Sequence, residues 1–162
     1  MRNIFFAASS AVALTLVYCL SPQLAQADDM LAPFERSDGK WGFVNSDHCW
    51  VIDPQFGVAY PFSEGLAPVR LDNKWGFIDR SGKVVIDPQF GVAGSFSEGL
   101  APVKLDNKYG FIDRSGQMVI NPQFDFVRSF SEGLARVELG DSSYQINKQG
   151  QILLDPTCVA RP

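Results

Sequence analysis

Carboxylate side chains that recur at a fixed interval are the first candidates for chemistry in this sequence of 162 residues. Two sets keep an interval of 34 positions or a multiple of it: Glu64, Glu98 and Glu132, and Asp53, Asp87 and Asp155. Paired carboxylates can act as general acid and base or bind a divalent cation. A catalytic pair is needed once, whereas these residues occur once in each repeat. The repetition therefore favours a structural role, in which Ser-Glu-Gly closes a turn and Asp-Pro ends a strand.

The only histidine, His48, limits the catalytic sites that the chain can build. A Ser-His-Asp or Cys-His site would have to include it, but Cys49 follows it directly and would point to the opposite face of a strand. A zinc site needs about four ligands, and beyond residues 1–27 only His48, Cys49 and Cys158 offer nitrogen or sulfur. We therefore predict a non-catalytic protein with no metal site and no cofactor. An enzyme built around His48 is the weaker alternative.

Residues 1–27 have the pattern of a secretory signal peptide. One positive charge at Arg2 precedes an apolar stretch over residues 4–20, and Ala25-Gln26-Ala27 is a small-x-small cleavage site. The alternative is an uncleaved anchor, although a membrane-spanning helix needs about 20 residues. Cleavage between Ala27 and Asp28 leaves residues 28–162 as one domain, located in the periplasm or secreted, without membrane insertion.

A tandem repeat with a period of 34 positions organises the rest of the chain. Lys-Trp-Gly-Phe stands at 40–43 and 74–77, and Lys-Tyr-Gly-Phe at 108–111. Residues 40–73 and 74–107 are identical at 24 of 34 positions, which identifies a tandem repeat protein. The net charge of −4 and the absence of a basic stripe argue against nucleic acid as a partner.

Each repeat contains signals for three short strands. Residues 74–79, 83–87 and 100–105 are rich in aromatic and β-branched side chains, as strands are. A turn at 80–82 joins the first two, a loop over 88–99 leads to the third, and the pair 106–107 forms a tight turn. The aromatic residues that recur in the frame are predicted to lie in the core: Trp41, Trp75, Tyr109, Phe43, Phe77 and Phe111.

Four such units follow one another, at about 30–56, 65–90, 99–124 and 133–156. The last is degenerate, because Ser143 and Tyr144 replace Trp-Gly, as expected of a terminal cap. We predict an all-β fold of four three-stranded antiparallel meander units in an open, twisted array. A closed, propeller-like or barrel-like ring is the alternative.

Cys49 and Cys158 lie at opposite ends of the repeats. An oxidising compartment permits a disulfide, but an open array would keep the two residues well beyond the about 7 Å between Cα atoms that a disulfide allows. We therefore predict two free thiols, and a closed ring would reverse this prediction.

The motifs resemble those of the bacterial WG (or KWG) repeats. The resemblance rests on Lys-Trp-Gly-Phe-Ile-Asp, Pro-x-Phe and Phe-Ser-Glu-Gly-Leu-Ala, and covers about 31–156. It implies a β-repeat domain of short strands that is often exported. It implies no catalytic residue, because the family has no agreed ones.

Segments that vary between repeats within a constant frame are the candidates for binding. Residues 57–61, 91–95 and 125–129 vary in this way, and Tyr60, Phe126 and Arg128 are large where equivalent residues can be small. We expect a module that binds an unidentified envelope or extracellular protein, or a peptide, through these residues. A cell-wall or carbohydrate-binding module, with a glycan as its ligand, is the alternative.

Overall fold

A computed structural model describes residues 30–153, which form four antiparallel sheets. The first sheet contains β1 (Ala32–Glu35), β2 (Trp41–Val44) and β3 (Trp50–Phe56). The second contains β4 (Val58–Ala59), β5 (Leu66–Leu71), β6 (Lys74–Asp79) and β7 (Val84–Phe90). The third contains β8 (Val92–Ala93), β9 (Leu100–Leu105), β10 (Lys108–Asp113) and β11 (Met118–Phe124). The fourth contains β12 (Phe126–Val127), β13 (Leu134–Leu139), β14 (Ser142–Asn147) and β15 (Ile152–Leu153).

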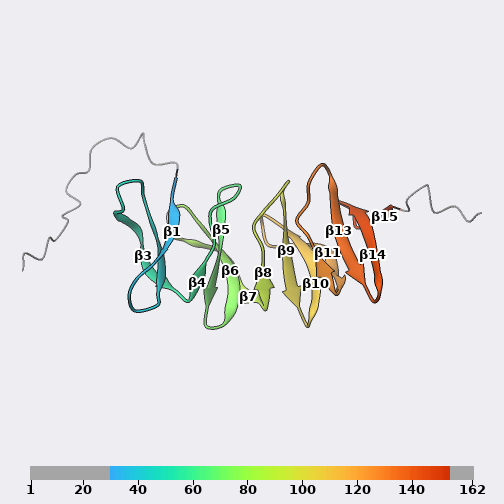
Figure 1. The fold of residues 1–162 in the computed structure, drawn as a ribbon, viewed down its shortest axis with the longest axis horizontal. Coiled ribbons are helices and arrows are strands. Elements are labelled where there is room, and N and C mark those ends of the chain that lie inside the picture. The colour runs from blue at the N-terminus through green and yellow to red at the C-terminus, as the bar shows by residue number, and fades with distance from the viewer. Residues whose placement is uncertain (1–29, 154–162) are drawn as a thin grey trace, which may run out of the picture.

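The sheets follow one another along one axis in chain order (Figure 1). None of them closes into a barrel, so the predicted all-β fold of repeated antiparallel units in an open array is confirmed. Among residues 30–153, no helix has the length and hydropathy that crossing a membrane requires. The predicted signal peptide, residues 1–27, lies outside the described residues.

Three of the four sheets contain four strands, where the sequence predicted three. The strand that was expected to end at Asp87-Pro88 continues to Phe90, and Val92–Ala93 then pairs with β9 at the edge of the next sheet. Pro88 is tolerated because β7 is an edge strand, where a missing N–H leaves no ladder bond unmade. The first part of the predicted loop over 88–99 therefore belongs to two strands, the end of β7 and the whole of β8.

The glycine after each tryptophan is required by a bulge in the neighbouring strand. Trp75 is opposite Phe90 and Phe77 is opposite Ile86, so three residues of β7 face Gly76 alone. A Cβ atom on Gly76 would lie 2.5 Å from the carbonyl oxygen of Ile86, closer than packing allows. Gly42 and Gly110 have the same surroundings. The Trp-Gly signature therefore marks a close approach of two backbones.

The predicted turns are confirmed. Asp106 and Asn107 have φ angles of 47° and 67°, as a two-residue hairpin turn of the primed type requires. In the turn after β6, Gly82 has a φ of 84°. The carboxylate of Asp79 accepts hydrogen bonds there from the hydroxyl and the amide of Ser81, at 2.6 and 2.9 Å. The hydroxyl bond is the main reason that the pKa of Asp79 is lowered.

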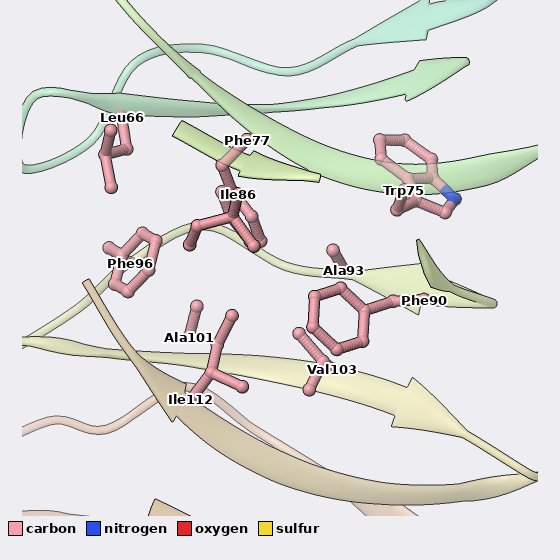
Figure 2. Close-up of a cluster of buried hydrophobic side chains, with 10 residues drawn as sticks. All are labelled: Leu66, Trp75, Phe77, Ile86, Phe90, Ala93, Phe96, Ala101, Val103 and Ile112. Carbon is pink, nitrogen blue, oxygen red and sulfur yellow. The ribbon is translucent and has the colours of Figure 1, made fainter. Parts of the chain in front are cut away.

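The core lies between successive sheets, as Figure 2 shows for the second and third. Phe77 on β6 is fully buried, and its ring centroid is 5.0 Å from that of Phe96, which precedes β9. Phe43, Phe111 and Trp75 are buried as predicted, whereas Trp41 and Tyr109 remain partly exposed. Each sheet buries apolar side chains against its neighbour, which a single small sheet cannot do.

Cys49 lies in the loop between β2 and β3 and is disulfide-bonded, so the prediction of a free thiol is wrong for this residue. The prediction rests on the distance that an open array sets between repeats. That distance does not limit a cysteine that lies outside the repeats. The other two cysteines, Cys19 and Cys158, lie beyond the repeats and outside the described residues.

Candidate functional site

The Ser-Glu-Gly motifs form tight turns at the start of β5, β9 and β13. In the second of these turns, Ser97 and Leu100 exchange backbone hydrogen bonds of 2.9 and 3.1 Å. Both central residues have positive φ angles, 53° for Glu98 and 85° for Gly99. Glycine adopts this region readily, but a glutamate there costs about 1–2 kcal/mol. In the first two of these turns, Glu64 and Glu98 have a role that offsets this backbone strain.

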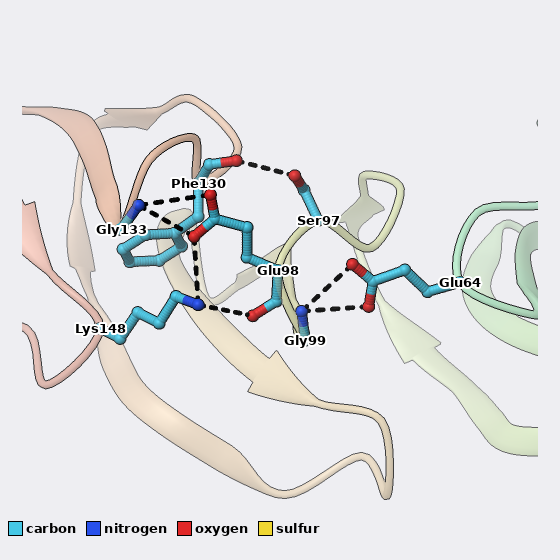
Figure 3. A network of polar contacts seen from close by, with 7 residues as sticks. All are labelled: Glu64, Ser97, Glu98, Gly99, Phe130, Gly133 and Lys148. Carbon is cyan, nitrogen blue, oxygen red and sulfur yellow. Dashed lines mark hydrogen bonds and ion pairs between the residues drawn. The ribbon is translucent and has the colours of Figure 1, made fainter.

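That role is to connect neighbouring sheets (Figure 3). The carboxylate of Glu64 accepts a hydrogen bond from the amide of Gly99, in the turn of the following sheet, at 3.0 Å. Glu98 accepts one from the amide of Gly133 at the same distance. The serine of each turn adds a second link, since the hydroxyl of Ser97 donates to the carbonyl of Phe130 at 2.7 Å. These carboxylates thus hold the array together.

A basic residue from a later hairpin completes each link. Lys148 donates to the carbonyl oxygen of Glu98 at 3.0 Å and lies 3.1 Å from its carboxylate. This contact is the main cause of the lowered pKa of Glu98. Arg114 donates to the carbonyl of Glu64 in the equivalent way. Sequence reasoning missed these cations, although Lys148 follows Arg114 by one interval of the repeat.

His48 occupies a turn position that is glycine in the later units. Its φ angle is 59°, and its amide donates to the carbonyl of Asn45 at 3.0 Å. The side chain is exposed. The sequence predicted a strand at His48 and Cys49, with the two side chains on opposite faces. Both residues lie instead in the turn between β2 and β3. Over residues 30–153, no three His, Cys, Asp or Glu side chains gather in a way that would hold a metal ion.

The variable segments enter the second, third and fourth sheets at one edge. We call the surface formed by residues 57–61, 91–95 and 125–129 the edge-strand face. Tyr60 follows β4 on this face, and its ring stacks on that of Trp75 with centroids 5.0 Å apart and planes 15° apart. Trp75 is buried and Tyr60 is 45% exposed. Tyr60 therefore presents an aromatic ring that the frame holds in place.

Phe126 and Arg128 lie together on the same face of the fourth sheet. Both side chains are exposed, and the residue between them, Val127, is buried. The ring of Phe126 meets that of Tyr109 edge-on, at 6.3 Å between centroids. Two of the three predicted contact residues thus lie at the edge of the fourth sheet, and Tyr60 lies two sheets away.

Two grooves between sheets were not expected from the sequence. The first has a volume of about 320 Å³ and is lined by Lys40, Gln55, Gly57, Arg70, Leu71, Asp72 and Asn73. The second has a volume of about 390 Å³ and is lined by Lys74, Gly91, Val92, Lys104, Leu105, Asp106 and Asn107. Most lining positions correspond at the interval of the repeat, so the grooves are copies of one feature. Both are lined by residues of the hairpin turns that follow β5 and β9. These turns lie along the lower edge of the array in Figure 1.

Comparison with known proteins agrees with the repeat. No curated protein and no solved structure matches the chain. The family described as WG containing repeat matches three consecutive segments, residues 41–75, 75–109 and 109–141. These segments cover most of the described residues and begin at the Trp or Tyr of the signature. The chain therefore belongs to the WG containing repeat family.

Proposed function

We propose that this protein is an exported, non-catalytic repeat module that binds a protein or peptide through the edge-strand face. The observation that carries the proposal is the pair of half-exposed aromatic rings, Tyr60 and Phe126, each resting on an aromatic side chain of the frame. Exposed aromatic residues and arginine are enriched among the residues that dominate protein interfaces. Rings that are already held in place lose little conformational entropy on binding.

The non-catalytic part of the proposal rests on how the repeated carboxylates are used. Glu64 and Glu98 are engaged in hydrogen bonds between sheets. His48 lies in an exposed turn. The export part rests on the signal-like residues 1–27, and places the protein in the periplasm or outside the cell. The acidic balance of the chain supports a partner other than nucleic acid.

A crosslinked pull-down from an envelope extract tests this function. The bait is the purified protein, and an unrelated acidic β-protein serves as the general control. The combined variant Tyr60→Ala, Phe126→Ala and Arg128→Ala is expected to lose the captured partner. The matched control is Val85→Ala with Val119→Ala, because these side chains are exposed to the same degree but lie on the opposite edge strands.

If both combined variants capture the partner equally well, the partner does not bind through the edge-strand face. If nothing proteinaceous is captured at saturating bait, the interaction proposal is wrong. A glycan would then be the better candidate ligand, because the exposed face of Tyr60 is a flat ring on which a sugar can stack. Retention on peptidoglycan that is lost in Tyr60→Ala alone would identify that function.

A further inference from the structure

A carboxylate side chain occupies a place in the third repeat that has no side chain in the two repeats before it. Asp125 stands where the preceding repeats have Gly57 and Gly91. Its carboxylate accepts a hydrogen bond from the ammonium of Lys108 at 2.5 Å and one from the amide of Gly140 at 2.9 Å. Lys108 belongs to the third sheet and Gly140 to the fourth. The carboxylate of Asp125 therefore joins two sheets.

The first and second grooves contain the same two donors without the carboxylate. Lys40 and Lys74 correspond to Lys108, and the amides of Asp72 and Asp106 correspond to that of Gly140. Within residues 30–153, neither ammonium group makes an ion pair, and neither amide donates a hydrogen bond. Each groove thus presents a cation and a backbone N–H whose counterparts at Asp125 bind a carboxylate.

The first and second grooves also carry more positive charge than the equivalent place beside Asp125. Arg70 lines the first groove and Lys104 the second, so each groove holds two cations against one aspartate. At the equivalent place in the fourth sheet stands Glu138. The first two grooves are consequently local excesses of positive charge on a protein whose net charge is −4. An anionic group is therefore attracted to these two grooves, and not to the equivalent place beside Asp125 and Glu138.

We propose that the first and second grooves each bind a side-chain carboxylate of an acidic peptide, in the place that Asp125 fills within the chain. Leu71 and Leu105 provide apolar surface beside the charges, which suits the aliphatic part of an aspartate or glutamate. The proposal deepens the proposed function, on which it rests, by naming the chemistry of the partner.

The repeat sets the spacing of the two carboxylates. Packed sheets lie about 10 Å apart, and three residues of an extended polyproline-type chain span about 9 Å and return to the same side. Two aspartates separated by two residues therefore reach both grooves at once. Because the second contact is then intramolecular, such a peptide binds more tightly than one with a single aspartate.

The test is an NMR titration of the ¹⁵N-labelled protein with synthetic peptides. The probe is a blocked hexapeptide with two aspartates separated by two glycines, and its controls are the two-asparagine peptide and a single-aspartate peptide. We expect the amide signals of Asp72 and Asp106 to shift and that of Gly140 to stay, since its partner is already present. The apparent dissociation constant of the two-aspartate peptide is expected to be about tenfold lower than that of the single-aspartate peptide, or better.

Two variants fill the grooves without disturbing the fold. Gly57→Asp and Gly91→Asp place a carboxylate where Asp125 has its own, and a Cβ atom at either glycine meets nothing closer than 3.5 Å. Combined, they are expected to abolish the shifts, whereas Gly57→Ala with Gly91→Ala keeps them. Lys40→Gln with Lys74→Gln is expected to abolish the shifts as well, and Lys108→Gln to leave them.

The proposal is wrong if the amides of Asp72 and Asp106 do not shift, or if they shift equally in the two Gly→Asp variants. A titration with acetate at the same carboxylate concentration distinguishes a peptide ligand from a small free carboxylate. Equal affinity for acetate would assign the grooves to small carboxylates and would contradict the proposal of a peptide ligand. The pull-down through Tyr60, Phe126 and Arg128 remains informative in each case, because none of these residues lines either groove.

Discussion

The hydroxyl of Ser97 donates a hydrogen bond to the carbonyl oxygen of Phe130 at 2.7 Å. Ser97 belongs to the turn before β9 and Phe130 to the loop before β13, so this bond joins the third sheet to the fourth. The equivalent bond runs from Ser63 to Phe96. In an array whose units contact only their neighbours, such links determine how cooperatively the units unfold.

The substitution Ser97→Ala tests the value of this link. It removes the donor to a partly buried carbonyl, and we expect it to lower the free energy of unfolding by about 1 kcal/mol. The matched control is Ser131→Ala, because the hydroxyl of Ser131 makes no hydrogen bond to any of residues 30–153. Urea denaturation of both variants measures the difference. Equal loss in the two would show that the hydroxyl acts within its own turn.

The substitution Gly76→Ala tests the explanation of the Trp-Gly signature. Its Cβ atom would lie 2.5 Å from the carbonyl oxygen of Ile86, so β6 and β7 have to move apart. We expect destabilisation by more than about 3 kcal/mol, which is large for one added methyl group. Gly91→Ala meets nothing closer than 3.6 Å and should change stability by less than about 0.5 kcal/mol. Thermal unfolding followed by circular dichroism distinguishes the two, and a well-tolerated Gly76→Ala would contradict the explanation.

The substitution Phe96→Ala tests the placement of the core between sheets. Phe96 is 2% exposed, and its ring packs on that of Phe77 in the second sheet, within a cluster that both sheets build. Loss of a buried phenylalanine ring is expected to cost about 3–5 kcal/mol. Phe126→Ala removes the same side chain from an exposed position and should cost much less. Similar midpoints for the two variants in guanidinium chloride would be incompatible with this core.

The contact between Glu98 and Lys148 predicts a pH dependence of stability. Lys148, and then the amide of Gly133, hold the pKa of Glu98 below its ordinary value of 4.5. A carboxylate with a lower pKa in the folded state stabilises the fold above its unfolded pKa, and this contribution is lost as the pH falls through the folded pKa. Glu98→Gln should therefore lower the melting temperature at pH 7, and the difference from the natural chain should close below pH 4.5.

Differential scanning calorimetry between pH 7 and pH 3 measures this dependence. Glu132→Gln is the control, because the carboxylate of Glu132 makes no hydrogen bond or ion pair to the described residues. It should leave the melting temperature almost unchanged across the range. A difference for Glu98→Gln that is constant with pH would contradict the role of its charge.

The long strands and the hairpin turns could be predicted from the sequence, because their signals are local. Residues 74–79 and 100–105 carry strand-forming side chains, and Asp106-Asn107 suits a turn with two positive φ angles. The strand Val92–Ala93 could not be predicted, because two residues have no periodicity and form a strand only by pairing with β9. Pro88 likewise signals the end of a strand, unless the strand lies at an edge.

The candidate site divides in the same way. Variation between repeats pointed to Tyr60, Phe126 and Arg128, and the structure shows that their side chains are exposed. The change from Gly91 to Asp125 was visible in the sequence as one of several differences between repeats. Its meaning depends on Lys108 and Gly140, which approach Asp125 only because successive sheets stack.

The sequence by itself determined the family, the period of the repeat and the antiparallel order of the strands in each unit, because these depend on neighbouring residues and on self-similarity. Only the tertiary structure decided how one unit meets the next. The link from Glu98 to Gly133 and the grooves beside Gly57 and Gly91 arise where two sheets face each other. Such contacts depend on the distance and orientation between units, which repeated side chains limit but do not specify.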